Sequence, residues 1–134
     1  MRRIHVSVTL AAAVLALGGC GAQQSAGGDF QGAEGAVAQV VEDLGAAAQE
    51  RDAEEICSRI LSPALATEVA AGGQCIDEMR KAVEDVNDFD LQVRDVTVSG
   101  TTARAQVRQG DDGRIATFEF AREGNAWRAT SLGA

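Results

Sequence analysis

Residues 86–98, with the sequence VNDFDLQVRDVTV, contain the change of periodicity that decides the fold of this chain. Before this stretch, apolar residues recur every three or four positions, as they do along one face of a helix. From Phe89 onward they alternate with polar residues, as in a strand that is buried on one side. The alternation changes from odd to even positions at Arg94 and Asp95, which predicts a β-bulge there.

Three turn signals divide the chain after this stretch. They are Ser99-Gly100, Gly110-Asp111-Asp112-Gly113 and Gly124-Asn125. Apolar residues alternate between the turns and after the last one, which predicts three further strands joined by hairpins. The residues expected to face inward on these strands are Ala103, Ala105, Val107, Ala116, Phe118, Phe120 and Trp127.

Helical signals come before the strands. The spacing of apolar residues predicts one helix over residues 33–50 and another over residues 74–86. Between them, Asp52-Ala53-Glu54-Glu55 has the form of a capping box, and Ser62-Pro63 is a second helix start, with Gly72-Gly73 as its stop. Helices followed by an antiparallel meander predict an α+β fold, with one helical layer on one face of the sheet.

The N-terminus has the pattern of a lipoprotein precursor. Met1-Arg2-Arg3 is basic, and the apolar run over residues 6–17 is shorter than the ~20 residues of a membrane span. The run ends in Leu17-Gly18-Gly19-Cys20, which resembles a bacterial lipobox. We expect cleavage before Cys20, a diacylglycerol thioether on its sulfur, and a stable anchor from two or three acyl chains. The alternative is an ordinary signal peptide, in which Cys20 is incidental.

These signals divide the chain into three parts. Residues 1–19 are expected to be a signal peptide, residues 20–32 a lipidated cysteine with a flexible tether, and residues 33–134 a single α+β domain. Phe30 is the sizeable apolar residue of the tether and is expected to pack on the edge of the domain. The predicted location is the extracytoplasmic face of the cell membrane, with membrane attachment through the lipid on Cys20.

Composition limits both the core and the partners. The chain has four Phe, one Trp and no Tyr, so its core is thin and gains from a covalent crosslink. Its formal charge is -8, and removal of two arginines with residues 1–19 makes it -10. The excess of acids lies between residues 29 and 88. We interpret it as a solvated helix face, with a docking face for a basic partner as the alternative, and we expect no nucleic-acid partner.

Two cysteines remain once Cys20 is lipidated. Cys57 and Cys75 each lie on the apolar stripe of a predicted helix, in a chain expected to reach an oxidising compartment. We therefore expect a disulfide between them, with two buried free thiols as the alternative. A metal site is disfavoured, because the single histidine, His5, lies in the segment to be removed and lipidation of Cys20 leaves no third free cysteine.

These features resemble small actinobacterial-type lipoproteins with a nuclear transport factor 2-like domain. The resemblance rests on the long first helix, the Cys57/Cys75 pair, the strand over residues 93–98 with its turn, and Gly124-Asn125-Ala126-Trp127-Arg128. It implies helices packed on a curved antiparallel sheet. Residues 62–73 are too short and too helical for the strands that the family usually has there, so a reduced sheet of about four strands is expected.

Enzymes of that family place His, Asp or Tyr in a cone-shaped cavity. The mature chain would contain neither His nor Tyr, and Asp88, Asp90 and Asp95 are placed for capping or solvation. The glycines at 110 and 113 lie between two predicted strands, which indicates a hairpin turn rather than a phosphate-binding loop. We therefore expect no catalytic residue, no cofactor and no metal.

Two functional hypotheses follow. The first is a non-catalytic module that binds a small apolar ligand or an envelope protein through its sheet, with Phe118, Phe120 and Trp127 as candidate ligand-binding residues. The second is a degenerate enzyme of the same fold that uses a buried carboxylate. An apolar cavity without a titratable group favours the first hypothesis, and a buried carboxylate facing such a cavity favours the second.

Overall fold

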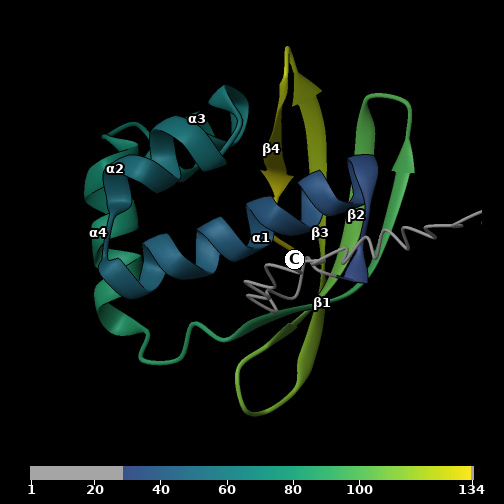
Figure 1. Ribbon diagram of the computed structural model, residues 1–134. Helices are drawn as coiled ribbons and strands as arrows, with labels where there is room; N and C mark the ends of the chain where they lie inside the picture. The colour runs from purple at the N-terminus through teal and green to yellow at the C-terminus, as the bar shows by residue number, and fades with distance from the viewer. Residues whose placement is uncertain (1–28, 134) are drawn as a thin grey trace, which may run out of the picture.

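The computed structural model describes residues 29–133, which form helices packed on an antiparallel sheet (Figure 1). The helical elements are α1 (Gly32–Glu50), α2 (Ala53–Glu55), the π-helical η2 (Ile56–Ile60), α3 (Pro63–Ala70) and α4 (Cys75–Asp85). The strands are β1 (Leu91–Ser99), β2 (Thr102–Gln109), β3 (Arg114–Glu123) and β4 (Ala126–Ser131). The sheet order is β1-β2-β3-β4, which confirms the predicted α+β meander.

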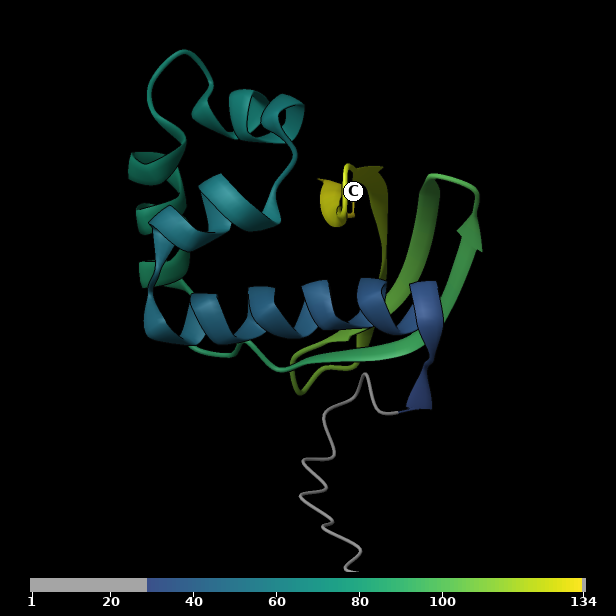
Figure 2. The same cartoon turned by 45° about the horizontal axis from the view of Figure 1, so that its top comes forward.

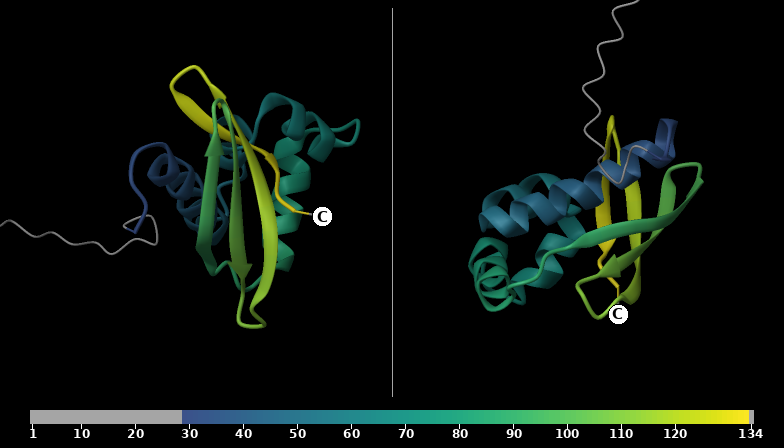
Figure 3. Two further views of the ribbon diagram at one scale, coloured as in Figure 1. Left: turned by 90° about the vertical axis from the view of Figure 1, so that its right-hand side faces the viewer. Right: turned by 60° about the horizontal axis from the view of Figure 1, so that its bottom comes forward.

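The helices cover one face of the sheet. In Figure 2, α1 runs along this inner face, while α3 and α4 lie beyond the β4 edge. The view of the sheet in Figure 3 shows the opposite face in front of all the helices, with none of the described helices covering it. Apolar side chains of the sheet therefore point toward α1, and polar ones point outward.

Two side chains cap helices as the sequence predicts. The Asp52 carboxylate accepts a hydrogen bond from the Glu55 backbone N–H at 2.9 Å, and the Ser62 hydroxyl accepts one from Leu65 N–H at 3.1 Å. Pro63 is the first residue of α3, where its missing N–H costs no helix bond. Both helix starts predicted from local sequence are confirmed.

The predicted bulge is also confirmed. Val93 pairs with Val107 and Asp95 pairs with Gln106, so Arg94 is the extra residue in β1. A bulge restores the alternation to the same face, and apolar residues on both sides of Arg94 therefore reach one core.

The first hairpin turn lies one residue later than predicted. Ser99 belongs to β1 and pairs with Thr102, so the loop is Gly100-Thr101 rather than Ser99-Gly100. The two-residue hairpin requires positive φ at its first loop position, and Gly100 supplies it with a φ of 60°. The turns at residues 110–113 and 124–125 lie where they were predicted.

Helix α4 ends before Val86, which was expected on its buried face. Val86 has extended backbone geometry and is 43% exposed, so that expectation is wrong. On the same helix, Val83 is buried, and Cys75 and Met79 pack partly buried against the core. The inward face of the helix therefore ends at Val83, because the chain leaves the helix toward β1 immediately after Asp85.

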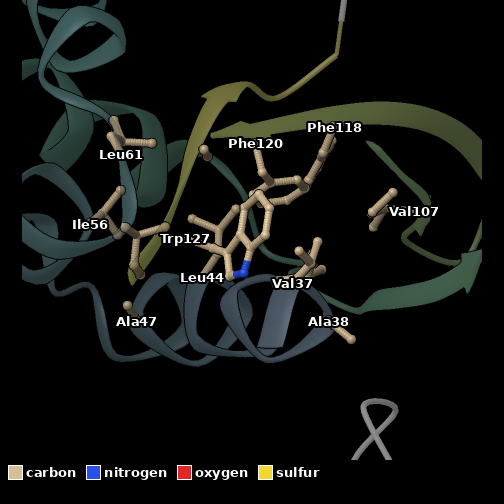
Figure 4. Close-up of a cluster of buried hydrophobic side chains, with 14 of the residues drawn as sticks. Val37, Ala38, Leu44, Ala47, Ile56, Leu61, Val107, Phe118, Phe120 and Trp127 are labelled. Carbon is tan, nitrogen blue, oxygen red and sulfur yellow. The ribbon is translucent and has the colours of Figure 1, made fainter. Parts of the chain in front are cut away.

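The core is formed by aromatic side chains of β3 and β4 against aliphatic ones of the helices (Figure 4). Phe118 and Phe120 are each 2% exposed, and Val37 and Ile56 are fully buried opposite them. Phe30 packs partly buried on this cluster, as expected for the end of the tether. A core with so few large side chains depends on each of them.

A disulfide joins Cys57 of η2 to Cys75 of α4, as the sequence predicts. The two residues are 18 positions apart, and the bond links the ends of the segment that contains α3. Loop closure in the unfolded chain makes such a bond stabilising. The helical segments beyond the β4 edge are thereby held together covalently.

Replacing both cysteines, Cys57→Ala with Cys75→Ala, should lower the free energy of unfolding by about 3 kcal/mol, because the unfolded chain regains loop entropy. Urea denaturation followed by circular dichroism measures this. The wild-type protein in reductant should unfold at the same urea concentration as the variant. Alkylation of both thiols in freshly secreted protein without reductant would contradict the disulfide.

Candidate functional site

A groove lies between α1, η2 and the start of β4, and we call it the α1–β4 groove. Its volume is about 410 Å³. Its apolar wall consists of Ala36, Val40, Ile60, Ala126 and Trp127, and its polar rim of Gln39, Asp43, Glu55, Arg59, Asn125 and Arg128. Three segments far apart in the sequence therefore contribute to one hollow.

Trp127 is the largest side chain in the apolar wall. It is the second residue of β4 and points inward under α1, where 7% of it remains exposed (Figure 4). Ile60 closes the wall from the end of η2 and is 3% exposed, while Val40 contributes a partly buried side chain from α1. The groove is thus a hollow at the edge of the core, and core side chains form its wall.

The charged groups on the helical side of the rim are paired with neighbours. The Gln39 side-chain amide donates a hydrogen bond to the Asp43 carboxylate at 2.9 Å. The Arg59 guanidinium lies 3.5 Å from the Glu55 carboxylate, one helical turn away. Both pairs are solvent-exposed, so each contributes little to stability. The Arg59–Glu55 pair joins opposite charges, whereas Asp43 is bonded to a neutral amide.

Arg128 connects β4 to the π-helical segment. Its guanidinium donates a hydrogen bond to the Ser58 carbonyl oxygen at 2.8 Å and lies 3.5 Å from the Glu123 carboxylate. Next to it, the Ser62 N–H donates to the Ala129 carbonyl oxygen at 2.8 Å. These bonds fix the position of η2 against the edge of the sheet, and with it the width of the groove.

The three predicted ligand-binding residues are neighbours in the structure, but they do not line one hollow together. Phe118 and Phe120 are core residues, and Trp127 reaches the α1–β4 groove. The apolar sheet face expected to carry a contact is covered by α1, because it supplies the core. Arg59 and Arg128 were not expected at a site, since no local pattern relates η2 to β4.

A second hollow lies at the turn formed by residues 110–113, and Asp88 lines it. Its carboxylate accepts hydrogen bonds from the Asp90 N–H at 3.1 Å and from the Asp111 N–H at 2.9 Å. Between residues 29 and 133, no group of three or more His, Cys, Asp or Glu side chains could hold a metal ion. Asp88 therefore bonds the backbone of the loop before β1 and of the turn after β2, rather than capping α4.

The described residues include no buried carboxylate. Ser62 is the one polar or charged residue among them that is buried, and its hydroxyl caps α3. On the exposed side of α4, a hydrogen bond to the Glu78 carboxylate raises the pKa of Lys81 above its usual 10.5. Neither group lies in the α1–β4 groove, so the groove presents shape and hydrogen bonding rather than an acid or base held in the protein interior.

The Arg128→Gln substitution should loosen the groove, because it removes the charge-assisted bond to the Ser58 carbonyl. We expect the free energy of unfolding to fall by about 1 kcal/mol and the Leu61 amide, bonded to Ile56 O at 2.9 Å, to exchange faster. Hydrogen exchange followed by NMR measures both. The matched control is Arg122→Gln, whose bond to the Gly124 carbonyl stays within its own turn; equal effects of the two variants would contradict the role of Arg128.

Cys20 and the tether before residue 29 lie outside the described residues. Within that described part, no helix combines the length and apolarity that crossing a bilayer requires. No protein-family model, curated protein or solved structure matches the chain. The functional assignment therefore depends on the geometry of the α1–β4 groove and on the N-terminal motif.

Proposed function

We propose that this protein is a membrane-anchored, extracytoplasmic lipoprotein whose domain binds a small ligand in the α1–β4 groove without catalysing a reaction. The observation that carries the proposal is the position of Trp127 at the base of a groove of about 410 Å³ with an apolar wall and a polar rim. Small-molecule sites in proteins have this range of volumes and this division of lining.

The chemistry of the groove supports binding over catalysis. Its carboxylates, Asp43 and Glu55, are on the rim and each has a partner. A degenerate enzyme of the kind considered from the sequence would need a buried carboxylate facing the cavity. Because the described carboxylates are outside the core, the geometry favours a site that recognises shape.

The position of the groove favours a small ligand over a protein partner at the sheet. The apolar face of the sheet is occupied by α1, and the outward face presents polar pairs such as Arg104 and Glu119, 3.2 Å apart. On this solvated face Ile115 of β3 is 58% exposed, but an isolated aliphatic residue is not the aromatic anchor that usually dominates interface energies.

The N-terminal motif supports the location. Residues 17–20 follow a basic start and an apolar run, in the order that lipoprotein precursors use. The described chain begins at residue 29, and Phe30 packs on the core directly before α1. Only a short segment therefore separates Cys20 from the domain, which would hold the domain close to the membrane surface.

We also propose that the domain is a reduced form of the nuclear transport factor 2-like fold. The order of elements, with helices first and a four-stranded antiparallel meander after them, supports this assignment. The chain between η2 and α4 forms α3 instead of strands, in agreement with the expected reduction of the sheet.

The anchor is tested at Cys20. Mass spectrometry of the protein purified from membranes should find an N-terminus at Cys20 that carries acyl chains. The Cys20→Ser variant should lack lipid and keep residues 1–19, because the thiol that receives the diacylglycerol is gone. An unmodified N-terminus at another residue would show that the protein is exported by the ordinary route.

Ligand binding is tested by filling the groove. Native mass spectrometry of protein purified from its own membranes should show a bound small molecule, and the Ala36→Phe variant should lose it, because Ala36 is an exposed lining residue of α1. Ala82→Phe makes the same change at an exposed position of α4 and should keep the ligand. No bound mass in the wild type, or equal binding in both variants, would count against the proposal.

A further inference from the structure

We infer that the ligand of the α1–β4 groove carries an uncharged hydrogen-bond acceptor of the carbonyl type, attached to a short apolar body. The inference rests on the proposed function and adds the chemical class of the ligand. It follows from one polar group at the base of the groove and from the balance of charges on the rim.

The polar group is the indole N–H of Trp127. More than nine-tenths of this side chain is buried, and its N–H has no hydrogen-bond partner among residues 29–133. No side-chain nitrogen in that range is both fully buried and without a partner, so the N–H still reaches solvent. Figure 4 shows the indole nitrogen at the ring edge that faces α1, the helix that forms the opposite wall of the groove.

A nearly buried tryptophan N–H usually has an acceptor, because leaving the donor without one costs free energy. The groove wall does not supply it. The backbone carbonyls of α1 are used within the helix, and the Asp43 carboxylate contacts Gln39 through Oδ1 and is not bonded to the indole. A ligand that places an acceptor against Trp127 would accept a hydrogen bond from the indole N–H and displace solvent from the groove.

The rim indicates that this acceptor is uncharged. Two carboxylates and two guanidinium groups line the groove, and each of them already has a partner. A carboxylate ligand would meet Asp43 and Glu55 as well as the arginines, on a domain that is acidic as a whole. An ammonium ligand would meet Arg59 and Arg128 and could not accept from the indole. A neutral carbonyl bonds the N–H without disturbing these pairs.

The body of the ligand is set by the apolar wall. Val40, Ile60 and Trp127 present aliphatic and aromatic surface beside the indole N–H. Each methylene group of a short chain that is buried on this wall should raise the affinity about fourfold. The groove therefore fits a short amide, ester or ketone better than an ion or a sugar.

The test uses three probes with the same chain length: hexanamide, hexanoate and hexylammonium. The protein is purified from membranes, held in phosphatidylcholine nanodiscs and labelled with ¹⁵N-tryptophan. Trp127 is the single tryptophan of the chain, so its indole N–H gives one resonance. Hexanamide should move this resonance in a saturable way, and the two ions should bind at least about fivefold more weakly.

The Trp127→Phe variant keeps the aromatic ring and removes the donor. Its affinity for hexanamide, measured by saturation-transfer NMR, should fall about three- to tenfold, the effect of one hydrogen bond. The Ala82→Phe variant is the control and should bind as the wild type does. Circular dichroism confirms that the variants are folded, and the indole shift in the wild type provides a readout that needs no variant.

The outcomes separate this inference from the proposed function. Equal affinity for hexanamide and either ion would overturn the inference that the acceptor is uncharged. Unchanged affinity for hexanamide in Trp127→Phe would overturn the inference that the indole N–H binds the ligand. If Ala36→Phe abolishes hexanamide binding in either case, the groove remains the ligand site. If none of the three probes binds, or if Ala36→Phe has no effect, the groove itself is the wrong site.

Discussion

The structure depends on the burial of Phe118, Phe120 and Trp127 beneath α1. These residues come from neighbouring strands and are the buried aromatic side chains of the core that the structure describes. The other side of this contact is the aliphatic stripe of α1, including Val37 and Val41, which are fully buried. Loss of one ring from so small a core would cost about 3–5 kcal/mol, a large part of the stability of a domain of this size.

The chain between α1 and α4 has to remain close to the edge of the sheet for this core to close. Two hydrogen bonds hold it there, from Arg128 to the Ser58 carbonyl and from Ser62 N–H to the Ala129 carbonyl, and the Cys57–Cys75 disulfide ties it to α4. Cys57 and Ser58 both belong to the π-helical segment η2. Segments of this kind are rare in proteins and are frequent near functional sites. In this protein η2 borders the α1–β4 groove through Ile60 and Arg59.

The α1–β4 groove is a consequence of how these elements meet. Helix α1 covers the aromatic side chains of the sheet but leaves one edge of Trp127 uncovered, and η2 closes the hollow from the other side. The resulting groove has an apolar base and a rim with two carboxylates and two guanidinium groups, each of which contacts a neighbouring residue. We propose that such a site selects a ligand by shape and by one hydrogen bond.

The sequence by itself determined the elements of this protein. Helix caps at Asp52 and Ser62, the bulge at Arg94 and the order of helices and strands were predictable, because capping and periodicity are set by residues a few positions apart. The exact start of the first turn was not predictable from the sequence, since strand pairing decides whether Ser99 or Thr101 is in the loop. Only the tertiary structure placed Val40, Ile60 and Trp127 around one groove, because contacts between α1, η2 and β4 join residues that no local pattern relates.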